Sequence, residues 1–183
     1  NFFVYIVRYA VLDWGPTLLG EWKGVSIHHA GWMVAAFEIS GIVGMLVAGW
    51  ATDRFFGGRG PRVCVICMAL ATVFVALFWG ISQPPMWLAT LLLGAAGFCI
   101  YGPQALVGIA AANIATKKAA ATAVGFTGLF GYASTLVSGW GLGLLAQHYG
   151  WNIAVGALIL IAIMGTLIFM AAWSAKANGY DND

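Results

Sequence analysis

The chain has 183 residues, of which 62% are hydrophobic and only 8% are charged, with a formal net charge of +2. A water-soluble domain carries about 25% charged residues, and a soluble fold of this length has no core large enough for so many apolar side chains. The composition therefore excludes an ordinary soluble domain and indicates an integral membrane protein that contacts the lipid bilayer. The absence of a basic block in the sequence argues against a nucleic-acid partner.

Six apolar stretches are long enough to cross a bilayer, which takes about 20 helical residues. Short polar, Gly-rich or Pro-rich connections separate them. The sequence thus predicts an all-α membrane domain over residues 1–183, with spans at 2–19, 30–51, 63–81, 87–113, 119–146 and 153–173. The first stretch starts at once, without the basic region and cleavage site of a signal peptide, so we expect the chain to be cut from a longer protein.

Basic residues gather on one side of the predicted membrane. With six crossings, that side holds Arg54, Arg59, Arg62, Lys117, Lys118 and Lys176, whereas the other side holds only Lys23. Cytoplasmic loops carry the excess of Lys and Arg. We therefore expect a multi-pass protein of the cytoplasmic (inner) membrane, with Asn1 and the C-terminal tail at the cytoplasmic face.

Three charged residues fall inside predicted spans, where each costs roughly 2.5–3.5 kcal/mol at the helix centre and usually faces a cavity. Arg8 lies about 10 Å along its helix from Asn1. Asp13 is about 140° around the same helix from Arg8, so a simple bridge between the two is not available. Tyr5 shares the face of Arg8, and a guanidinium fork beside a hydroxyl suits phosphate or carboxylate. A structural ion pair is the alternative role for Arg8.

Glu38 is the third buried charge. Its helix face also carries Gly41 and Ala48, which is typical of a close helix contact. The spacing leaves three roles open for Glu38: holding a neighbouring helix, moving a proton, or pairing with a cation from another segment.

The fourth and fifth spans contain further polar candidates. Pro103 removes a helical donor and predicts a kink next to Tyr101, which either lines a transport path or is a passive bend. Tyr132 lies on a glycine-rich stripe of the fifth span, so its hydroxyl is predicted to point toward other helices. We find no nucleophile–base pair and no metal-ligand cluster in the sequence, and we expect neither an enzyme nor a cofactor.

Two sets of residues carry a family resemblance. The segment Gly49-Trp-Ala-Thr-Asp53-Arg54-Phe-Phe-Gly-Gly-Arg59 resembles the G-x-x-x-D-R signature of the major facilitator superfamily, which lies between the second and third helices of each six-helix half. The resemblance implies that Asp53, Arg54 and Arg59 belong to a charge network at the cytoplasmic gate. A basic surface loop with Asp53 as a helix cap is the alternative.

The second set resembles the C-terminal half of the organophosphate:phosphate antiporters. It comprises Tyr5-Ile-Val-Arg8 through Asp13-Trp-Gly-Pro16, then Ile100-Tyr101-Gly102-Pro103, then Lys117-Lys118 through Gly131-Tyr132. The resemblance implies a twelve-helix fold whose two halves rock, with two arginines gripping phosphate. Arg8 matches the arginine of this half, and its counterpart belongs to an N-terminal half that is absent here. Tyr5, Tyr101 and Tyr132 match cavity tyrosines, and Asp13 and Glu38 match acidic residues of the family.

The resemblance therefore implies exchange of a small organophosphate for inorganic phosphate. Glycerol 3-phosphate is the first expectation for the substrate, with phosphoglycerate or a hexose phosphate as alternatives. The same family contains membrane sensors that bind a sugar phosphate and signal to a histidine kinase, and nothing in the sequence separates a carrier from a sensor. A purely structural membrane anchor does not need the buried charges Arg8, Asp13 and Glu38.

Overall fold

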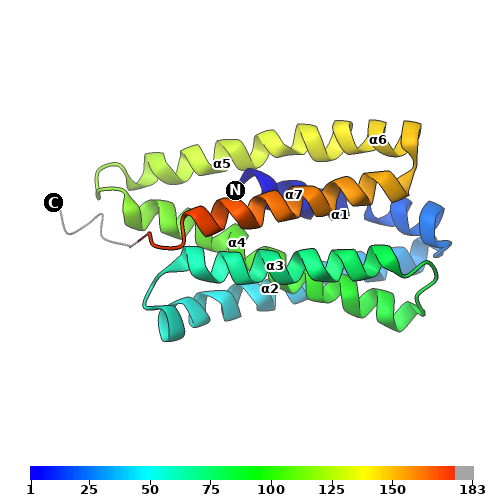
Figure 1. The fold of residues 1–183 in the computed structure, drawn as a ribbon, viewed down its shortest axis with the longest axis horizontal. Helices are drawn as coiled ribbons and strands as arrows, with labels where there is room; N and C mark the ends of the chain where they lie inside the picture. The colour runs from blue at the N-terminus through cyan, green and yellow to red at the C-terminus, as the bar shows by residue number, and fades with distance from the viewer. Residues whose placement is uncertain (176–183) are drawn as a thin grey trace.

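The computed structural model describes residues 1–175, and within that range it contains helices and no strand. Six helical rods run side by side along the longest axis of the molecule (Figure 1). Their elements are α1 Phe2–Lys23, α2 Ile27–Phe56, α3 Gly60–Gly80, α4 Met86–Ile114, α5 Ala120–Leu136, the π turn Val137–Gly141, α6 Leu142–Tyr149 and α7 Trp151–Ala171.

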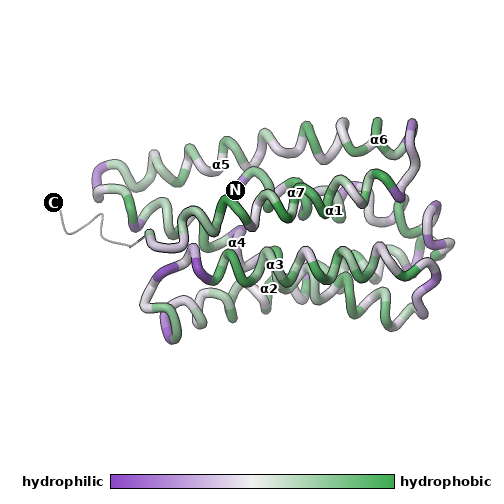
Figure 2. The backbone as a smooth tube through the Cα atoms, in the orientation of Figure 1, coloured by the Kyte–Doolittle hydropathy of each residue, from purple (hydrophilic) through white to green (hydrophobic). Residues whose placement is uncertain are grey.

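All six rods are long and apolar enough to cross a membrane, with α5, the π turn and α6 forming one rod of 30 residues. The connections lie at the two ends of the bundle, where hydrophilic residues gather, and the middles of the helices are apolar (Figure 2). Many apolar side chains face outward: in α7, only 28% of the most apolar stretch is buried. The predicted architecture of six membrane-crossing helices is confirmed.

Two predicted connections are shorter than expected because the helices continue into polar residues. α1 extends to Lys23 and ends at Gly24, whose φ of 68° lies in the left-handed region that glycine tolerates. α2 extends to Phe56 and ends in the same way. Asp53 and Arg54 therefore lie in the last turn of α2, so the alternative of a surface loop in which Asp53 caps a helix is wrong for these two residues.

Helices α2 and α4 touch backbone to backbone. A Cβ on Gly44 would overlap the carbonyl of Phe98, and a Cβ on Gly97 would overlap the carbonyl of Phe37. Small residues allow this close approach, which is a main source of helix association in lipid. The contact fixes the rotation of α2 against α4, and both helices contribute to the site described below.

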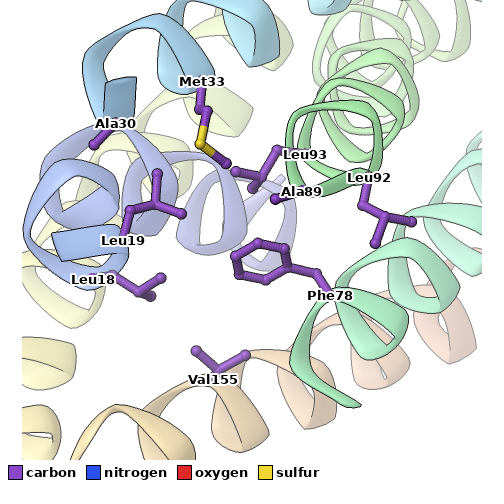
Figure 3. Close-up of a cluster of buried hydrophobic side chains, with 9 residues drawn as sticks. All are labelled: Leu18, Leu19, Ala30, Met33, Phe78, Ala89, Leu92, Leu93 and Val155. Atoms are coloured by element: carbon purple, nitrogen blue, oxygen red, sulfur yellow. The ribbon is translucent and has the colours of Figure 1, made fainter. Parts of the chain in front are cut away.

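An apolar cluster joins five helices near the end of the bundle where α1 stops (Figure 3). Its buried side chains are Leu18, Leu19, Ala30, Met33, Phe78, Ala89, Leu92, Leu93 and Val155. Lys23 closes this end by donating from Nζ to the carbonyl of Ile81 at 2.6 Å. The cluster ties α1 to the α2–α4 pair and so holds the inner turns of α1 in place.

Candidate functional site

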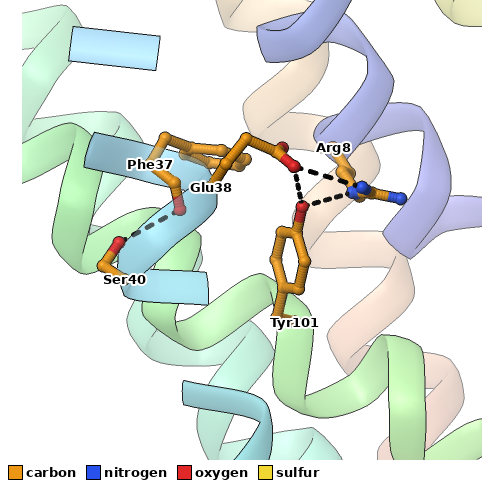
Figure 4. Close-up of polar contacts among 5 residues, drawn as sticks. All are labelled: Arg8, Phe37, Glu38, Ser40 and Tyr101. Atoms are coloured by element: carbon orange, nitrogen blue, oxygen red, sulfur yellow. Dashed lines mark hydrogen bonds and ion pairs between the residues drawn. The ribbon is translucent and has the colours of Figure 1, made fainter. Parts of the chain in front are cut away.

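Arg8, Glu38 and Tyr101 form one connected polar group from the inner turns of α1, α2 and α4 (Figure 4). Arg8 donates from Nε to the Tyr101 hydroxyl at 2.9 Å and from Nη2 to Glu38 Oε2 at 3.3 Å. The Tyr101 hydroxyl donates to the same carboxylate oxygen. Arg8 and Glu38 form the one ion pair between side chains of residues 1–175, and with Tyr101 the group joins three helices.

The partner of Arg8 therefore comes from the neighbouring helix and not from its own. Asp13 is exposed on α1 and makes no ion pair with Arg8, as its rotation around the helix predicted. Of the three roles left open for Glu38, the structure shows contact with a neighbouring helix. A structural pair and an anion site are compatible at Arg8 only if the guanidinium keeps free donors.

Arg8 does keep donors. A guanidinium carries five N–H groups, and the two contacts to Tyr101 and Glu38 use Nε and one hydrogen of Nη2. Its second terminal nitrogen points away from both partners (Figure 4). The side chains of Arg8 and Glu38 are 17% and 30% exposed, so part of each stays accessible. Glu38 Oε1 is buried and has no hydrogen-bond partner, which leaves the carboxylate incompletely satisfied.

Aromatic rings hold the guanidinium in place. The Arg8 Cζ lies 4.6 Å from the centroid of the Tyr101 ring and 5.5 Å from that of Tyr9. Cation–π contacts at such distances are favourable, and more so where water is excluded. The Tyr101 ring is 6% exposed and packs over Gly41, where a Cβ would overlap it. Gly41 thus makes the space that lets Tyr101 reach the charged pair.

A row of tyrosines continues the site along α1 and α5. The Tyr5 ring lies 5.6 Å from that of Tyr9 and 6.3 Å from that of Tyr132, measured between centroids. Gln104 of α4 lies close enough to Tyr5 for its side chain to interact with the tyrosine hydroxyl. Tyr132 packs against Tyr5 in a T-shaped arrangement, although 66% of its surface stays exposed. The structure therefore brings the predicted tyrosines Tyr5 and Tyr132 together, and it places Tyr101 against Arg8.

Sequence reasoning missed Tyr9 and Gln104. Gln104 lies about one helical turn beyond Tyr101. It is the single side-chain amide in the inner turns of α4, and this isolated polar residue is the sequence feature that could have identified it. Its Oε1 is buried without a hydrogen-bond partner. Pro103 is buried behind it, and α4 continues through this proline without a break. The predicted kink remains a prediction.

The residues of the G-x-x-x-D-R signature lie at the end of α2, far from the group of Arg8, Glu38 and Tyr101. Asp53 follows Glu38 by fifteen positions on α2, or about 22 Å at the rise of an α-helix. It lines a small cavity of about 150 Å³ together with Thr52, Gly58 and Asn113. The structure therefore does not bring Asp53, Arg54 or Arg59 to Arg8, and their role at a gate remains a prediction.

No group of three or more His, Cys, Asp or Glu side chains is placed to hold a metal ion within residues 1–175. Cys64, Cys67 and Cys99 are free thiols in α3 and α4. The chemistry that the central group can perform is recognition: a fixed guanidinium, adjacent hydroxyls and restricted water access suit an anion with several oxygens.

Comparison with known proteins agrees with this chemistry. Residues 1–179 match the family described as the Major Facilitator Superfamily. The chain is 40% identical over 176 residues to a "Probable hexose phosphate transport protein" of Chlamydia pneumoniae, covering 96% of this chain and 39% of that protein. It is 36% identical over 197 residues to the "Glycerol-3-phosphate transporter" of Haemophilus influenzae, covering 97% and 41%.

A third relative has a different kind of name. The chain is 34% identical over 175 residues to the "Membrane sensor protein UhpC" of Salmonella typhimurium, covering 95% of this chain and 39% of that protein. The chain thus spans about two fifths of the length of these relatives. Their names are consistent with the organophosphate:phosphate antiporter family.

Proposed function

Because the chain belongs to the major facilitator superfamily, we propose that it is the C-terminal six-helix half of a carrier that exchanges a phosphate ester for inorganic phosphate. The observation that carries the proposal is the largely buried Arg8, which is anchored by Tyr101 and Glu38 while part of its fork stays free. A phosphate monoester offers the oxygens and the negative charge that this fork binds best. The names of the relatives support the same ligand class.

Competition for Arg8 couples binding to movement of the helices. A phosphate dianion on Arg8 brings two negative charges next to the carboxylate of Glu38, and like charges in a poorly hydrated site repel. Phosphate binding therefore weakens the link between α1 and α2, and phosphate release restores it. An empty carrier is held by its internal ion pair, which favours obligate exchange over leakage. A second arginine from the other half would complete the grip.

The organic part of the substrate is either a glycerol or a hexose unit. The relatives include proteins named for each, and they do not favour glycerol 3-phosphate over a hexose phosphate. A sensor is the second candidate function, because a relative named as a membrane sensor matches the same stretch of chain. In a sensor the same site would bind the phosphate ester without moving it across the membrane.

The test uses the complete protein in liposomes loaded with labelled phosphate. We expect phosphate efflux when glycerol 3-phosphate or glucose 6-phosphate is added outside, and a loss of about tenfold or more in Arg8→Lys, which lacks the fork. Arg62→Lys is the matched control, because Arg62 bonds the carbonyl of Trp173 near the end of the bundle. Saturable binding without efflux would replace the carrier with the sensor, and an unaltered Arg8→Lys would remove Arg8 from the site.

A further inference from the structure

The fifth rod contains a π turn at Val137–Gly141, one helical turn after Tyr132. A π turn shifts helical hydrogen bonds by one residue and so disturbs the regular pairing of its carbonyl groups. The indole nitrogen of Trp14, on α1, donates to two of these carbonyls, at 3.0 Å to Ser138 and at 3.1 Å to Gly139. Ser138 is completely buried, so these contacts lie inside the α1–α5 interface.

The π turn decides which side of the rod faces α1. A Cβ on Gly131 would lie 3.4 Å from the Tyr5 ring, and a Cβ on Gly143 would lie 2.5 Å from the ring of Trp14. Both glycines therefore face α1, although twelve residues of regular α-helix would turn them about 120° apart. The one extra residue of a π turn removes about 100° of this difference. The bulge is thus the feature that lets one rod contact α1 both before and after it.

The side chains of Asn1, just before α1, and of Trp14 hold main-chain carbonyls of the fifth rod on either side of Tyr132. Asn1 donates from Nδ2 to the carbonyl of Thr127 at 3.1 Å, and Trp14 holds the π turn beyond Tyr132. Tyr132 itself is 66% exposed, so packing around its side chain does not fix its direction. The direction of Tyr132 follows from the rotation of α5, and that rotation depends on the bulge.

We propose that Trp14 is a positioning residue for the binding site: its indole N–H holds the π turn and thereby keeps Tyr132 turned toward Tyr5. The inference rests on the proposed function, because Tyr132 matters only if the tyrosine row contacts the phosphate ester. The same inference explains the glycine at position 143: a side chain there would collide with the Trp14 ring.

The kinetic test compares Trp14→Phe, which keeps a ring and loses the N–H, with Trp151→Phe. Trp151 is the matched control, because its ring lies 5.9 Å from that of Trp14 but its N–H bonds Glu21 and not the π turn. In the complete protein, we expect Trp14→Phe to raise the KM for the exchanged phosphate ester by about three- to tenfold, with the maximal rate changed less. Trp151→Phe should leave the KM near that of the unmodified protein.

A second readout does not depend on transport. With Cys64, Cys67 and Cys99 replaced by alanine, Asn1→Cys and Gly131→Cys place two thiols across α1 and α5, since a Cβ on Gly131 would lie 3.3 Å from the end of the Asn1 side chain. Asn1→Cys also removes the bond to Thr127, so every variant is compared within this same background. We expect disulfide formation to fall in Trp14→Phe and to persist in Trp151→Phe.

Gly143→Ala places a methyl group against the Trp14 ring without removing the indole N–H. We expect this variant to show the same raised KM and the same fall in disulfide formation, in a protein that still purifies as folded. Equal cross-linking and equal KM in the Trp14 and Trp151 variants would overturn the proposal. If the unmodified protein shows no exchange, the proposed function fails, and the cross-linking result still decides the role of Trp14.

Discussion

Arg8 and Glu38 are thirty positions apart in the sequence, yet Nη2 of the arginine lies 3.3 Å from Oε2 of the glutamate. The pair links α1 to α2, and Tyr101 of α4 bridges the two partners. A charge placed so deep in a membrane helix needs a counterion. Glu38 supplies this counterion from within the chain, and any anion that binds Arg8 has to compete with it.

The hydroxyl of Tyr101 orients Arg8, so Tyr101→Phe should weaken phosphate binding without abolishing it. The ring stays under the guanidinium at 4.6 Å, and only the hydrogen bonds to Arg8 and Glu38 are lost. We expect the KM for phosphate exchange to rise about three- to tenfold, less than in Arg8→Lys. Tyr149→Phe, at an exposed ring at the end of α6, is the control, and equal KM values for the two variants would argue against this role.

The fold followed from the sequence because six apolar stretches separated by polar connections admit few other arrangements in a membrane. The ends of α1 and α2 were placed too early, since polar residues such as Glu21 and Asp53 continue the helix until a glycine stops it. The π turn was not predicted. It lies among glycines whose spacing looked like a simple close-packing stripe, and Trp14 is more than a hundred positions away from it.

The members of the site could be named from the sequence, but not their partners. Helix geometry excluded Asp13 as the partner of Arg8, and the structure agrees. The choice of Glu38 depends on how α2 is rotated, which is set by the contact of Gly44 with α4 and is not visible in the spacing of α2 alone. Gln104 was overlooked because its role depends on Tyr5, which lies on another helix.

The contact between α2 and α4 should tolerate no added side chain. Gly44→Ala places a methyl group against the main-chain carbonyl of Phe98, which cannot move aside as a flexible side chain can. Overpacking of this kind costs about 1–3 kcal/mol, so we expect the apparent melting temperature in detergent to fall by about 5 °C or more. Gly31→Ala, on the same helix with open space around it, should leave the melting temperature nearly unchanged. Equal melting curves would show that the two helices can separate slightly at little cost.

The orientation in the membrane can be tested with single cysteines in the connections. With the three native cysteines replaced by alanine, Ser26→Cys lies between α1 and α2, and Thr116→Cys lies between α4 and α5. From the excess of Lys and Arg, we expect the connection between α4 and α5 to lie in the cytoplasm and the connection between α1 and α2 to lie outside. A membrane-impermeant maleimide should label Ser26→Cys in intact cells and Thr116→Cys only after permeabilisation. The opposite pattern would invert the proposed topology.

The most direct test of the competition at Arg8 is the affinity of the complete, purified protein for inorganic phosphate, measured by calorimetry. Glu38→Gln removes the internal counterion and keeps an oxygen for Tyr101, so phosphate should bind about three- to tenfold more tightly. Glu21→Gln is the control, because that carboxylate bonds the indole of Trp151 at 2.7 Å and makes no contact with Arg8. Competition between Glu38 and phosphate for Arg8 predicts tighter binding in Glu38→Gln alone, together with loss of binding in Arg8→Lys. Unchanged or weaker binding in Glu38→Gln would contradict it and leave the Arg8–Glu38 pair as a structural link between two helices.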